Sequence, residues 1–360
     1  MCFNLVAGQG DFATVGGITQ ELFHLFDGEI RYADCPDLSR IHVWCGDLSE
    51  HQLSLPLSAR EQLVGRAPKS DNIHAVIHCG ALVQYNYDYR SLKGINVNPT
   101  AYLPKITAQS STIGKFLYVS GGITPNFHQR DASTDGEPAL TNGYTQSKLV
   151  SEIVVRGCAD CPAFQGRRIR IIRPGYMIGS AANPTPVQTD FIWRLVAAYL
   201  RMGFYNADAN SQWLYISDVE RVARVVVTAI FEGSHSRIMD AVWDGLPLGS
   251  FWGSLTADFG YNLRPLRESH WLGNLRSTIA REAESNPLFP FFHVLEKELK
   301  SVGSTANSDM DSASVLDAIR GNIQNLIEAG FLPPPPSSSG QNGGRAVENG
   351  PNSAEAFTEL

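Results

Sequence analysis

The sequence predicts an α/β fold built on a doubly wound parallel sheet, with a smaller C-terminal region. Two observations lead to this prediction. Several segments are apolar throughout, as strands are when helices cover both faces of a parallel sheet. Helical segments separate them, and each ends in a short turn of small residues. The predicted strands are Phe3–Ala7, Arg40–Cys45, Ile73–His78, Phe116–Val119 and Arg168–Ile172.

The turns that follow these strands predict where a ligand binds. Parallel strands present their carboxyl ends at one edge of the sheet, and ligands of such sheets bind there. The residues at these ends are Asp47, Gly80, Ala81, Ser120 and Pro174. Their shared position is stronger evidence for a binding edge than any single motif.

Tyr144 and Lys148 stand at the start of a predicted helix, because an apolar series at helical spacing follows them as far as Val155. Residues four apart share one face of a helix. A free tyrosine hydroxyl has a pKa of about 10, and a nearby ammonium group stabilises the phenolate and makes the hydroxyl a usable acid. The pair therefore suits a reductase that protonates an oxyanion as hydride arrives. The alternative is an exposed pair on an amphipathic helix.

Composition excludes several classes of protein. The 360 residues are 43% hydrophobic and 18% charged, with a formal net charge of -7, so neither nucleic acid nor an anionic membrane is an expected partner. The sequence has no run of about 20 apolar residues, and Met1–Ala7 lacks the features of a signal peptide. Cys158 and Cys161 have no second pair to complete a metal site. We therefore expect free thiols and a cytoplasmic location.

The pattern changes after residue 178. An aromatic-rich helix over Asp190–Met202 is followed by a strand, Trp213–Ile216, and by the helix Val219–Phe231, which Asp218 is placed to cap. Pro, Ser, Gly and Asn dominate from about Pro333 onward, a composition typical of disorder. The expected division is a first domain over 1–178, a second region over 179–332 and a disordered tail over 333–360.

A set of short motifs extends over roughly residues 1–333. These are Gly46-Asp47-Leu48, His78–Ala81, Asn96-Val97, Tyr118–Ser120, Tyr144 with Lys148, Arg173–Gly179, Asp190–Arg194, Trp213–Val219 and Gly330–Pro333. With them the chain resembles the extended short-chain dehydrogenase/reductase superfamily. More narrowly, it resembles the thioester reductase domains that end fungal nonribosomal peptide synthetases and carboxylic acid reductases. The Arg-Pro-Gly-Tyr and Asp-Phe-Ile-Trp-Arg blocks distinguish these domains from nucleotide-sugar epimerases.

The resemblance implies a Rossmann-type NAD(P)-binding domain over 1–178 and a substrate-binding region over 179–332. It also implies NADPH-dependent reduction of an acyl thioester to an aldehyde or alcohol in fungal secondary metabolism. The partner would be a carrier (thiolation) domain that presents the acyl group on phosphopantetheine. Tyr144 would donate the proton, Lys148 would hold the nicotinamide ribose and lower the Tyr144 pKa, and Ser120 would be a third catalytic residue. The cofactor-binding residues would be Asp47 and Leu48 at the adenine, Cys79, Gly80 and Ala81 along the cofactor, and Pro174 near the nicotinamide.

The N-terminus departs from this family, whose first strand leads into a Gly-x-x-Gly-x-x-Gly turn that places the pyrophosphate on a helix N-terminus. In one alignment Phe3–Ala7 is the second strand, the first strand and its glycine turn are missing, and Ala7 replaces a basic residue expected to bind the 2′-phosphate. In the other alignment Gly8-x-Gly10-x-x-Ala13 is a degenerate fingerprint, and Asp34 is placed to bind a ribose hydroxyl.

The family also places a serine or threonine directly after Val119-Ser120 to polarise the carbonyl, and this chain has Gly121 and Gly122 there. Glycine offers no hydroxyl, and losing one oxyanion donor typically costs about 10²–10³ in rate. Two alternatives to an active reductase therefore stay open at this point. One is a non-catalytic remnant that binds a partner. The other is a nucleotide-sugar epimerase or dehydratase that holds NAD through Asp34.

Overall fold

The computed structural model describes residues 44, 46–66, 73–121, 142–231, 239–242, 244–293, 295, 299, 302 and 313–336. Several predicted features lie outside this part of the chain. They are the strand Phe3–Ala7, the fingerprint over residues 8–13, Asp34, Gly122, most of the Arg40–Cys45 strand and most of the tail.

The first half is built on a four-stranded parallel sheet. Its strands are β1 (Ala75–His78), β2 (Lys115–Val119), β3 (Arg168–Arg173) and β7 (Met239–Ala241), adjacent in that order. Val76 pairs with Phe116, and Phe116 pairs with Ile169. This parallel register brings the carboxyl ends of the strands to one edge, as the sequence predicts.

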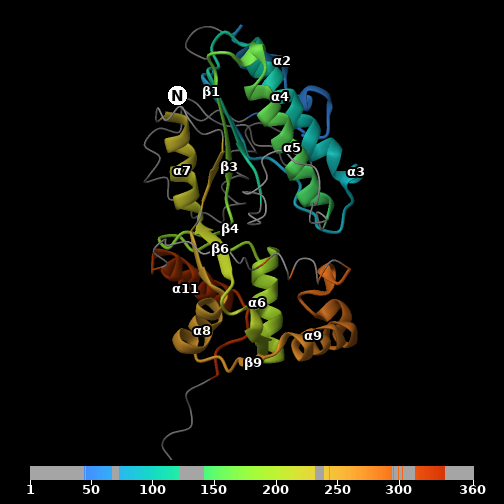
Figure 1. Cartoon of the computed structure of the whole chain (residues 1–360), viewed down its shortest axis with the longest axis vertical. Helices are drawn as coiled ribbons and strands as arrows, with labels where there is room; N and C mark the ends of the chain where they lie inside the picture. Colours follow the sequence, from blue (N-terminus) through green and yellow to red (C-terminus); the bar gives the residue numbers. More distant parts are fainter. Residues whose placement is uncertain are drawn as a thin grey trace, which may run out of the picture.

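Helices cover both faces of this sheet (Figure 1). On one face lie α2 (Leu57–Leu63), α4 (Asn98–Gln109) and α5 (Gly143–Ala159), which pack on Phe116 and Tyr118 of β2. On the other face lies α7 (Val219–Phe231), which packs on Leu117 and Val119. Alternate residues of β2 therefore enter different cores, which explains why the strand is apolar throughout.

The second half combines short strands with four longer helices. Strand β6 (Trp213–Asp218) pairs in parallel with β4 (Tyr176–Ile178) and antiparallel with β8 (Gly245–Pro247). A second pair, β5 (Phe204–Asn206) and β9 (Arg264–Leu266), is parallel. The helices are α6 (Phe191–Met202), α8 (Leu248–Phe259), α9 (Glu268–Glu282) and α11 (Ala313–Glu328).

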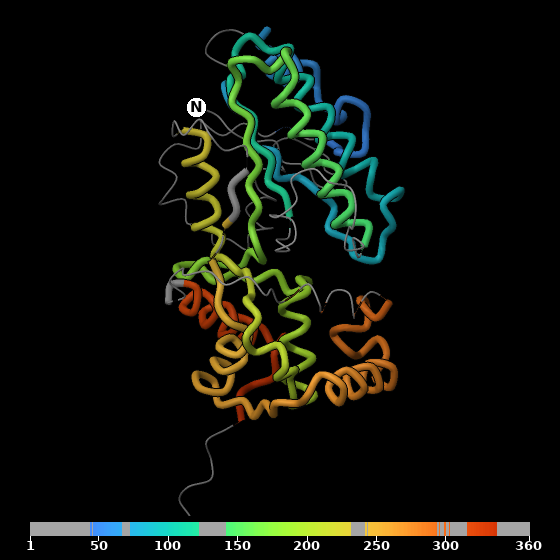
Figure 2. Tube along the Cα trace, viewed as in Figure 1, coloured from blue at the N-terminus to red at the C-terminus, as the bar shows by residue number. Residues whose placement is uncertain are grey.

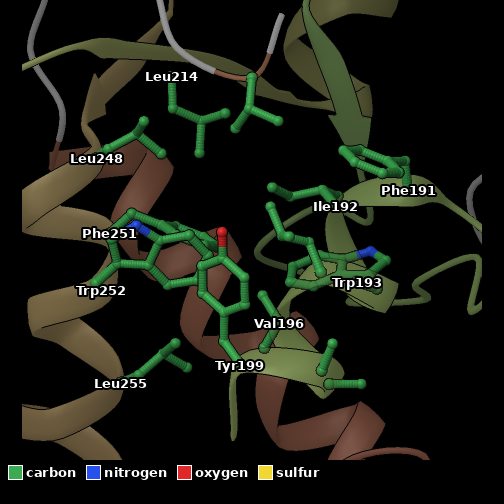
Figure 3. Close-up of a cluster of buried hydrophobic side chains, with 14 of the residues drawn as sticks. Phe191, Ile192, Trp193, Val196, Tyr199, Leu214, Leu248, Phe251, Trp252 and Leu255 are labelled. Carbon is green, nitrogen blue, oxygen red and sulfur yellow. The ribbon is translucent and has the colours of Figure 1, made fainter. Parts of the chain in front are cut away.

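One large apolar core holds this half together. Trp193 is fully buried on α6, and Figure 3 shows Val196 and Tyr199 of α6 close to Phe251 and Trp252 of α8. Helix α6 ends at Gly203, whose φ of +72° is left-handed and favours glycine. The helix predicted over Asp190–Met202 is therefore observed, and its aromatic side chains form the core.

The chain crosses between the two halves more than once. Figure 2 shows α7, gold in the trace, beside the blue-to-green segments although β4, α6 and β6 precede it in the other half. Strand β7 follows α7 and pairs with β3, so Ile171 lies opposite Met239. Residues beyond 178 thus contribute to the first sheet, which a single boundary at residue 178 does not anticipate.

The shorter elements connect these layers. The turns near the sheet are η3 (His51–Ser54), the four-residue helix α3 (Tyr89–Leu92), the π-helical turn η5 (Lys93–Val97) and η7 (Pro162–Phe164). Those in the second half are η8 (Ala207–Ala209), η9 (Ala283–Ser285) and η10 (Phe289–Phe291). None of the helices in the described part of the chain is long and apolar enough to cross a membrane.

A buried asparagine joins the C-terminal helix to the rest of the second half, and it gives a stability prediction. The Asn322 side chain accepts from the Gly179 N–H at 2.9 Å and donates to the Gly179 carbonyl at 2.8 Å. Asn322→Ala leaves both groups buried without a partner. We expect a loss of about 2–4 kcal/mol in the free energy of unfolding, measured by urea denaturation. The exposed neighbour Gln324→Ala is the control, and equal midpoints for the two variants would contradict this role.

Candidate active site

The candidate site lies where β1, β2 and β3 end. Lys148 reaches this edge from α5, and its Nζ donates to the carbonyl oxygen of Val119, the last residue of β2, at 3.1 Å. The next residue, Ser120, donates its N–H to the Ile172 carbonyl of β3 at 2.8 Å. The structure therefore brings Ser120 and Lys148 together at the predicted edge, although they lie in separate segments of the chain.

Tyr144 shares the first turns of α5 with Lys148. Asn142 caps the helix by accepting from the Thr145 N–H at 2.8 Å, so both side chains project from a well-formed start of the helix. The Lys148 Nζ lies 6.0 Å from the centre of the Tyr144 ring and 5.0 Å from that of Tyr118. The two predicted catalytic residues thus face one region of space.

The electrostatics differ from the sequence-based expectation. Burial lowers the pKa of Lys148 to about 8, against the opposing influence of the Cys79 thiol and the Glu152 carboxylate. Burial raises the pKa of Tyr144 to about 12, and the negative charge of Asp190 adds to this rise. The predicted lowering of the Tyr144 pKa by Lys148 is therefore not seen, because desolvation dominates at this hydroxyl.

Gly121 explains one of the two departures from the family pattern. A Cβ atom at this position would lie 2.9 Å from the Tyr144 hydroxyl oxygen and 3.6 Å from Cε of Lys148. The backbone of residue 121 therefore passes directly beside the tyrosine hydroxyl. A serine or threonine here would compete with Tyr144 for space. Only glycine lets the backbone lie this close to the Tyr144 hydroxyl without movement, and residue 121 therefore has no side-chain hydroxyl group of its own.

Ser120, the residue before Gly121, does carry a hydroxyl group. Its side chain is buried, and its Oγ has no hydrogen-bond partner within the described residues. Buried hydroxyl groups normally have a partner, and an orphan one calls for an explanation. A ligand at the strand ends would supply that partner.

The predicted cofactor residues lie around the same edge. A Cβ on Gly80, just after β1, would come within 2.9 Å of Leu48 Cδ1, so the loop containing Leu48 packs directly on the end of that strand. The Asp47 carboxylate accepts from the N–H and the hydroxyl of Ser49, both at 2.7 Å, and these bonds lower its pKa. Cys79 is exposed, Ala81 is half-buried and Pro174, at the end of β3, is buried.

Asn96 belongs to one of the sequence motifs, but the motif alone predicted no role for it. The structure shows what its side chain contacts. Its Oδ1 accepts from the Leu82 N–H at 2.7 Å, and its Nδ2 donates to the Leu82 carbonyl at 3.1 Å and to Ser147 Oγ at 3.0 Å. Asn96 thereby holds the loop after β1 against α5, next to Lys148. Its contacts span more than fifty residues, so spacing alone could not reveal them.

A buried ion pair also supports α5. Arg173 Nε donates to Glu152 Oε1 at 2.8 Å, and Nη2 donates to Oε2, with both side chains almost fully buried. Glu152 is one helical turn beyond Lys148, so Tyr144, Lys148 and Glu152 lie along one face of α5. The shared face of Tyr144, Lys148 and Glu152 can be inferred from their four-residue spacing. The pairing of Arg173 with Glu152 was not predicted, because Arg173 was considered only as part of a motif.

Aromatic rings lie between Tyr144 and the second half. The Tyr85 ring meets Tyr144 edge-on at 5.6 Å and Phe291 at 5.6 Å, and Phe291 packs on Phe191 at 5.0 Å. In the aromatic segment Phe289–Phe292, Phe291 is 7% exposed, whereas Phe289 and Phe292 are 36% and 39% exposed. The loop after β1 thus connects α5 to α6 and η10.

The chain is similar to several known proteins. An NAD-binding family model described as "Male sterility protein" matches residues 18–226. "Nonribosomal peptide synthetase-like enzyme fsqF" of Aspergillus fumigatus is 40% identical over 261 residues, which are 71% of this chain and 17% of that protein. "Nonribosomal peptide synthetase inpA" of Emericella nidulans is 33% identical over 297 residues, 82% of this chain and 20% of that protein. The chain thus spans about a fifth of the length of these relatives.

Solved structures support the fold. The PhqB reductase domain from Penicillium fellutanum is 24% identical, with a TM-score of 0.70 over 91% of this chain and 86% of that one. The terminal R domain from the myxalamid PKS-NRPS pathway is 23% identical, with a TM-score of 0.66 over 92% and 85%. These likenesses confirm the predicted fold class, an α/β fold built on a parallel sheet.

The buried ion pair gives a prediction about stability. Arg173→Leu leaves the Glu152 carboxylate buried without its partner, so we expect the free energy of unfolding to fall by about 3–5 kcal/mol. Thermal and urea denaturation measure this loss. The matched control is Arg320→Leu, which breaks the more exposed pair with Asp258 and should change stability little. Similar losses for the two variants would show that burial does not distinguish the pairs.

Proposed function

The chain belongs to the NAD-binding family described as "Male sterility protein", and on that premise we propose that it reduces an acyl thioester to an aldehyde or alcohol with NADPH. The observation that carries the proposal is that the Tyr144 hydroxyl and the Lys148 side chain both lie against the backbone at Gly121, directly after the buried Ser120 at the end of β2. The relatives are synthetases that make peptide-like products in fungi, which supports an acyl substrate from secondary metabolism.

The residues present fit a nicotinamide dinucleotide. The absence of a Cβ at Gly80 and Gly121 lets Leu48 and the Tyr144 hydroxyl lie close to the strand ends, and the buried Ser120 hydroxyl has no partner among the described residues. We assign Lys148 and Ser120 to the ribose and nicotinamide side with Pro174. Cys79, Gly80 and Ala81 would follow the cofactor backbone, and Asp47 and Leu48 would lie at the adenine. When bound, the reduced cofactor supplies hydride to the carbonyl carbon.

The choice of NADPH over NADH is the finer part of this proposal and is carried by the likeness to thioester reductases. The positions that would read the 2′-phosphate, near Ala7 in one alignment and Asp34 in the other, lie outside the described residues. Asp34 was also the basis of the epimerase alternative, so that alternative has no support from the described site.

Tyr144 acts in this proposal as the proton donor to the carbonyl oxygen on which negative charge develops. With a pKa of about 12 it is fully protonated near neutral pH, so its proton is always available to a stronger base. Lys148, with a pKa of about 8, is still mainly charged there and stabilises the phenolate that forms when the proton leaves. The Tyr144 phenolate then takes the hydroxyl proton back as the carbon–sulfur bond breaks, so that a thiolate leaves and the aldehyde remains.

We propose a carrier domain as the source of the thioester. One fold neighbour is a thiolation-reductase di-domain from an archaeal synthetase, 16% identical with a TM-score of 0.63 over 91% of this chain and 83% of that one. Exposed apolar side chains lie on two segments that a hydrogen bond from Asn86 to the Pro290 carbonyl joins. They are Val83, Tyr87, Phe289 and Phe292. A docked carrier would cover them near Tyr85, whose ring contacts Tyr144.

The described cysteines, Cys79, Cys158 and Cys161, are free thiols. Free thiols persist in reducing compartments, and they support the cytoplasm as the location we propose for this reaction.

The direct test follows loss of reduced-nicotinamide absorbance with NADPH and an acyl-pantetheine thioester. Tyr144→Phe removes the proton donor, so we expect turnover to fall by at least about 100-fold. Turnover by the unmodified chain should also decline above about pH 8, because Lys148 loses its charge as pH rises through its pKa. Calorimetric binding of NADPH by both proteins is the control. If neither consumes NADPH, the chain is a non-catalytic remnant and the proposal is wrong.

Gly121 provides a second test in the same assay. The Cβ introduced by Gly121→Ala or Gly121→Ser would lie 2.9 Å from the Tyr144 hydroxyl and must displace it. Small misplacements of a catalytic group cost up to about 10²-fold in rate, so we expect both variants to lose about tenfold or more. Gly114→Ala, where a Cβ meets nothing within 4 Å, is the matched control. Higher turnover for Gly121→Ser would show that the site lacks an oxyanion donor instead.

A further inference from the structure

A hollow lies in the C-terminal half, away from the strand ends. Helices α6, α8 and α9 and the turn η8 enclose a cavity of about 190 Å³. A water molecule occupies about 30 Å³ in the liquid, so the cavity has room for a small organic molecule. Tyr199 of α6 lines it, two turns or roughly 12 Å along the helix from Phe191, which belongs to the aromatic contacts near Tyr144. The cavity is therefore separate from the candidate active site.

Aromatic rings form the inner wall. Tyr199 packs on Trp252 at 4.8 Å and meets Trp271 edge-on at 6.1 Å, and all three side chains are buried. Figure 3 shows the Tyr199 ring standing beside Trp252 between α6 and α8. The faces of such rings carry negative charge density and attract an organic cation.

Trp271 adds a polar group that the described residues do not satisfy. Its indole N–H is buried and lies near the Tyr199 hydroxyl, but it completes no hydrogen bond of ordinary geometry within the described residues. Trp271 is 4% exposed and lines the cavity. An indole nitrogen can only donate, so a matching ligand would carry an oxygen acceptor.

Two carboxylates lie at the outer wall of the cavity. Asp208 Oδ2 accepts from the Glu268 N–H at 2.9 Å, and Asn206 Oδ1 accepts from the Asp208 N–H at 3.0 Å, so this edge has a defined shape. Both acidic side chains are exposed, and neither forms an ion pair within the described part of the chain. Arg267 precedes Glu268, but no Lys, Arg or His is among the described residues that line the cavity.

We propose that this cavity binds an organic ammonium compound with an aromatic body and a neutral oxygen acceptor, such as an aromatic amino alcohol or amino-acid amide. The ammonium group lies between the two carboxylates and the ring faces. The aromatic body packs on the wall formed by Tyr199 and Trp252. The oxygen accepts from the Trp271 N–H. A free carboxylate on the ligand would be repelled by Asp208 and Glu268, which distinguishes an amide or alcohol from a free amino acid.

Isothermal titration calorimetry of the full chain tests the site with three probes that differ by one group. Phenylalaninol carries all three features, 3-phenylpropan-1-ol lacks the ammonium group, and phenethylamine lacks the oxygen. We expect phenylalaninol to bind about tenfold more tightly than either of the others. Undetectable binding of phenylalaninol at millimolar concentration, or equal binding of all three probes, would make the cavity a packing defect.

Variants assign the contacts. Asp208→Asn and Glu268→Gln should each weaken phenylalaninol about fivefold and leave 3-phenylpropan-1-ol unchanged. Trp271→Phe should weaken phenylalaninol but not phenethylamine, a pattern that general damage to the fold would not give. The exposed carboxylate of Glu284, on η9, does not line the cavity, and Glu284→Gln is the matched control. The assay needs no NADPH and no turnover, so its outcome is independent of the proposed reductase activity.

Discussion

The burial of one ammonium group at the ends of the strands is the constraint on which the site depends. Lys148 is 5% exposed, and its nearest fixed partner is the Val119 carbonyl, a neutral group. A buried cation with such a partner is costly, and its lowered pKa records that cost. The Glu152 carboxylate offsets part of it, while its own charge is matched by Arg173. The α5 face and the end of β3 therefore form one connected set of charges, held in place by the sheet.

The sequence predicted the parts of this arrangement that follow from local patterns. The apolar strands, the helix that carries Tyr144 and Lys148, and the Asp218 cap, which accepts from the Arg221 N–H at 2.9 Å, are all periodic or positional signals. The contacts of Asn96 and Arg173 were not predicted, because they join segments that only the folded sheet brings together. The sign of the Tyr144 pKa shift was also missed, since spacing reveals a neighbouring charge but not the depth of burial.

Helix α6 connects the two halves of the molecule in a way that its sequence did not indicate. Its N-terminal residue Phe191 packs on Phe291, which in turn contacts Tyr85 beside Tyr144. Two turns later Tyr199 enters the core and lines the cavity. The helix is buried along most of its length, so one packed element carries both sets of aromatic contacts.

The altered pKa values of Tyr144 and Lys148 together set the protonation states at the site. Burial moves the phenol and the ammonium group in opposite directions, toward the neutral form of each. Near neutral pH this leaves a protonated tyrosine beside a lysine that is still mainly charged, which is the pair of states that a proton donor and its stabilising cation require. The close approach of Gly121 excludes a third side chain from this pair. The proposed chemistry of the site therefore depends on the position of the Tyr144 hydroxyl, and Gly121 leaves room for the hydroxyl at that position.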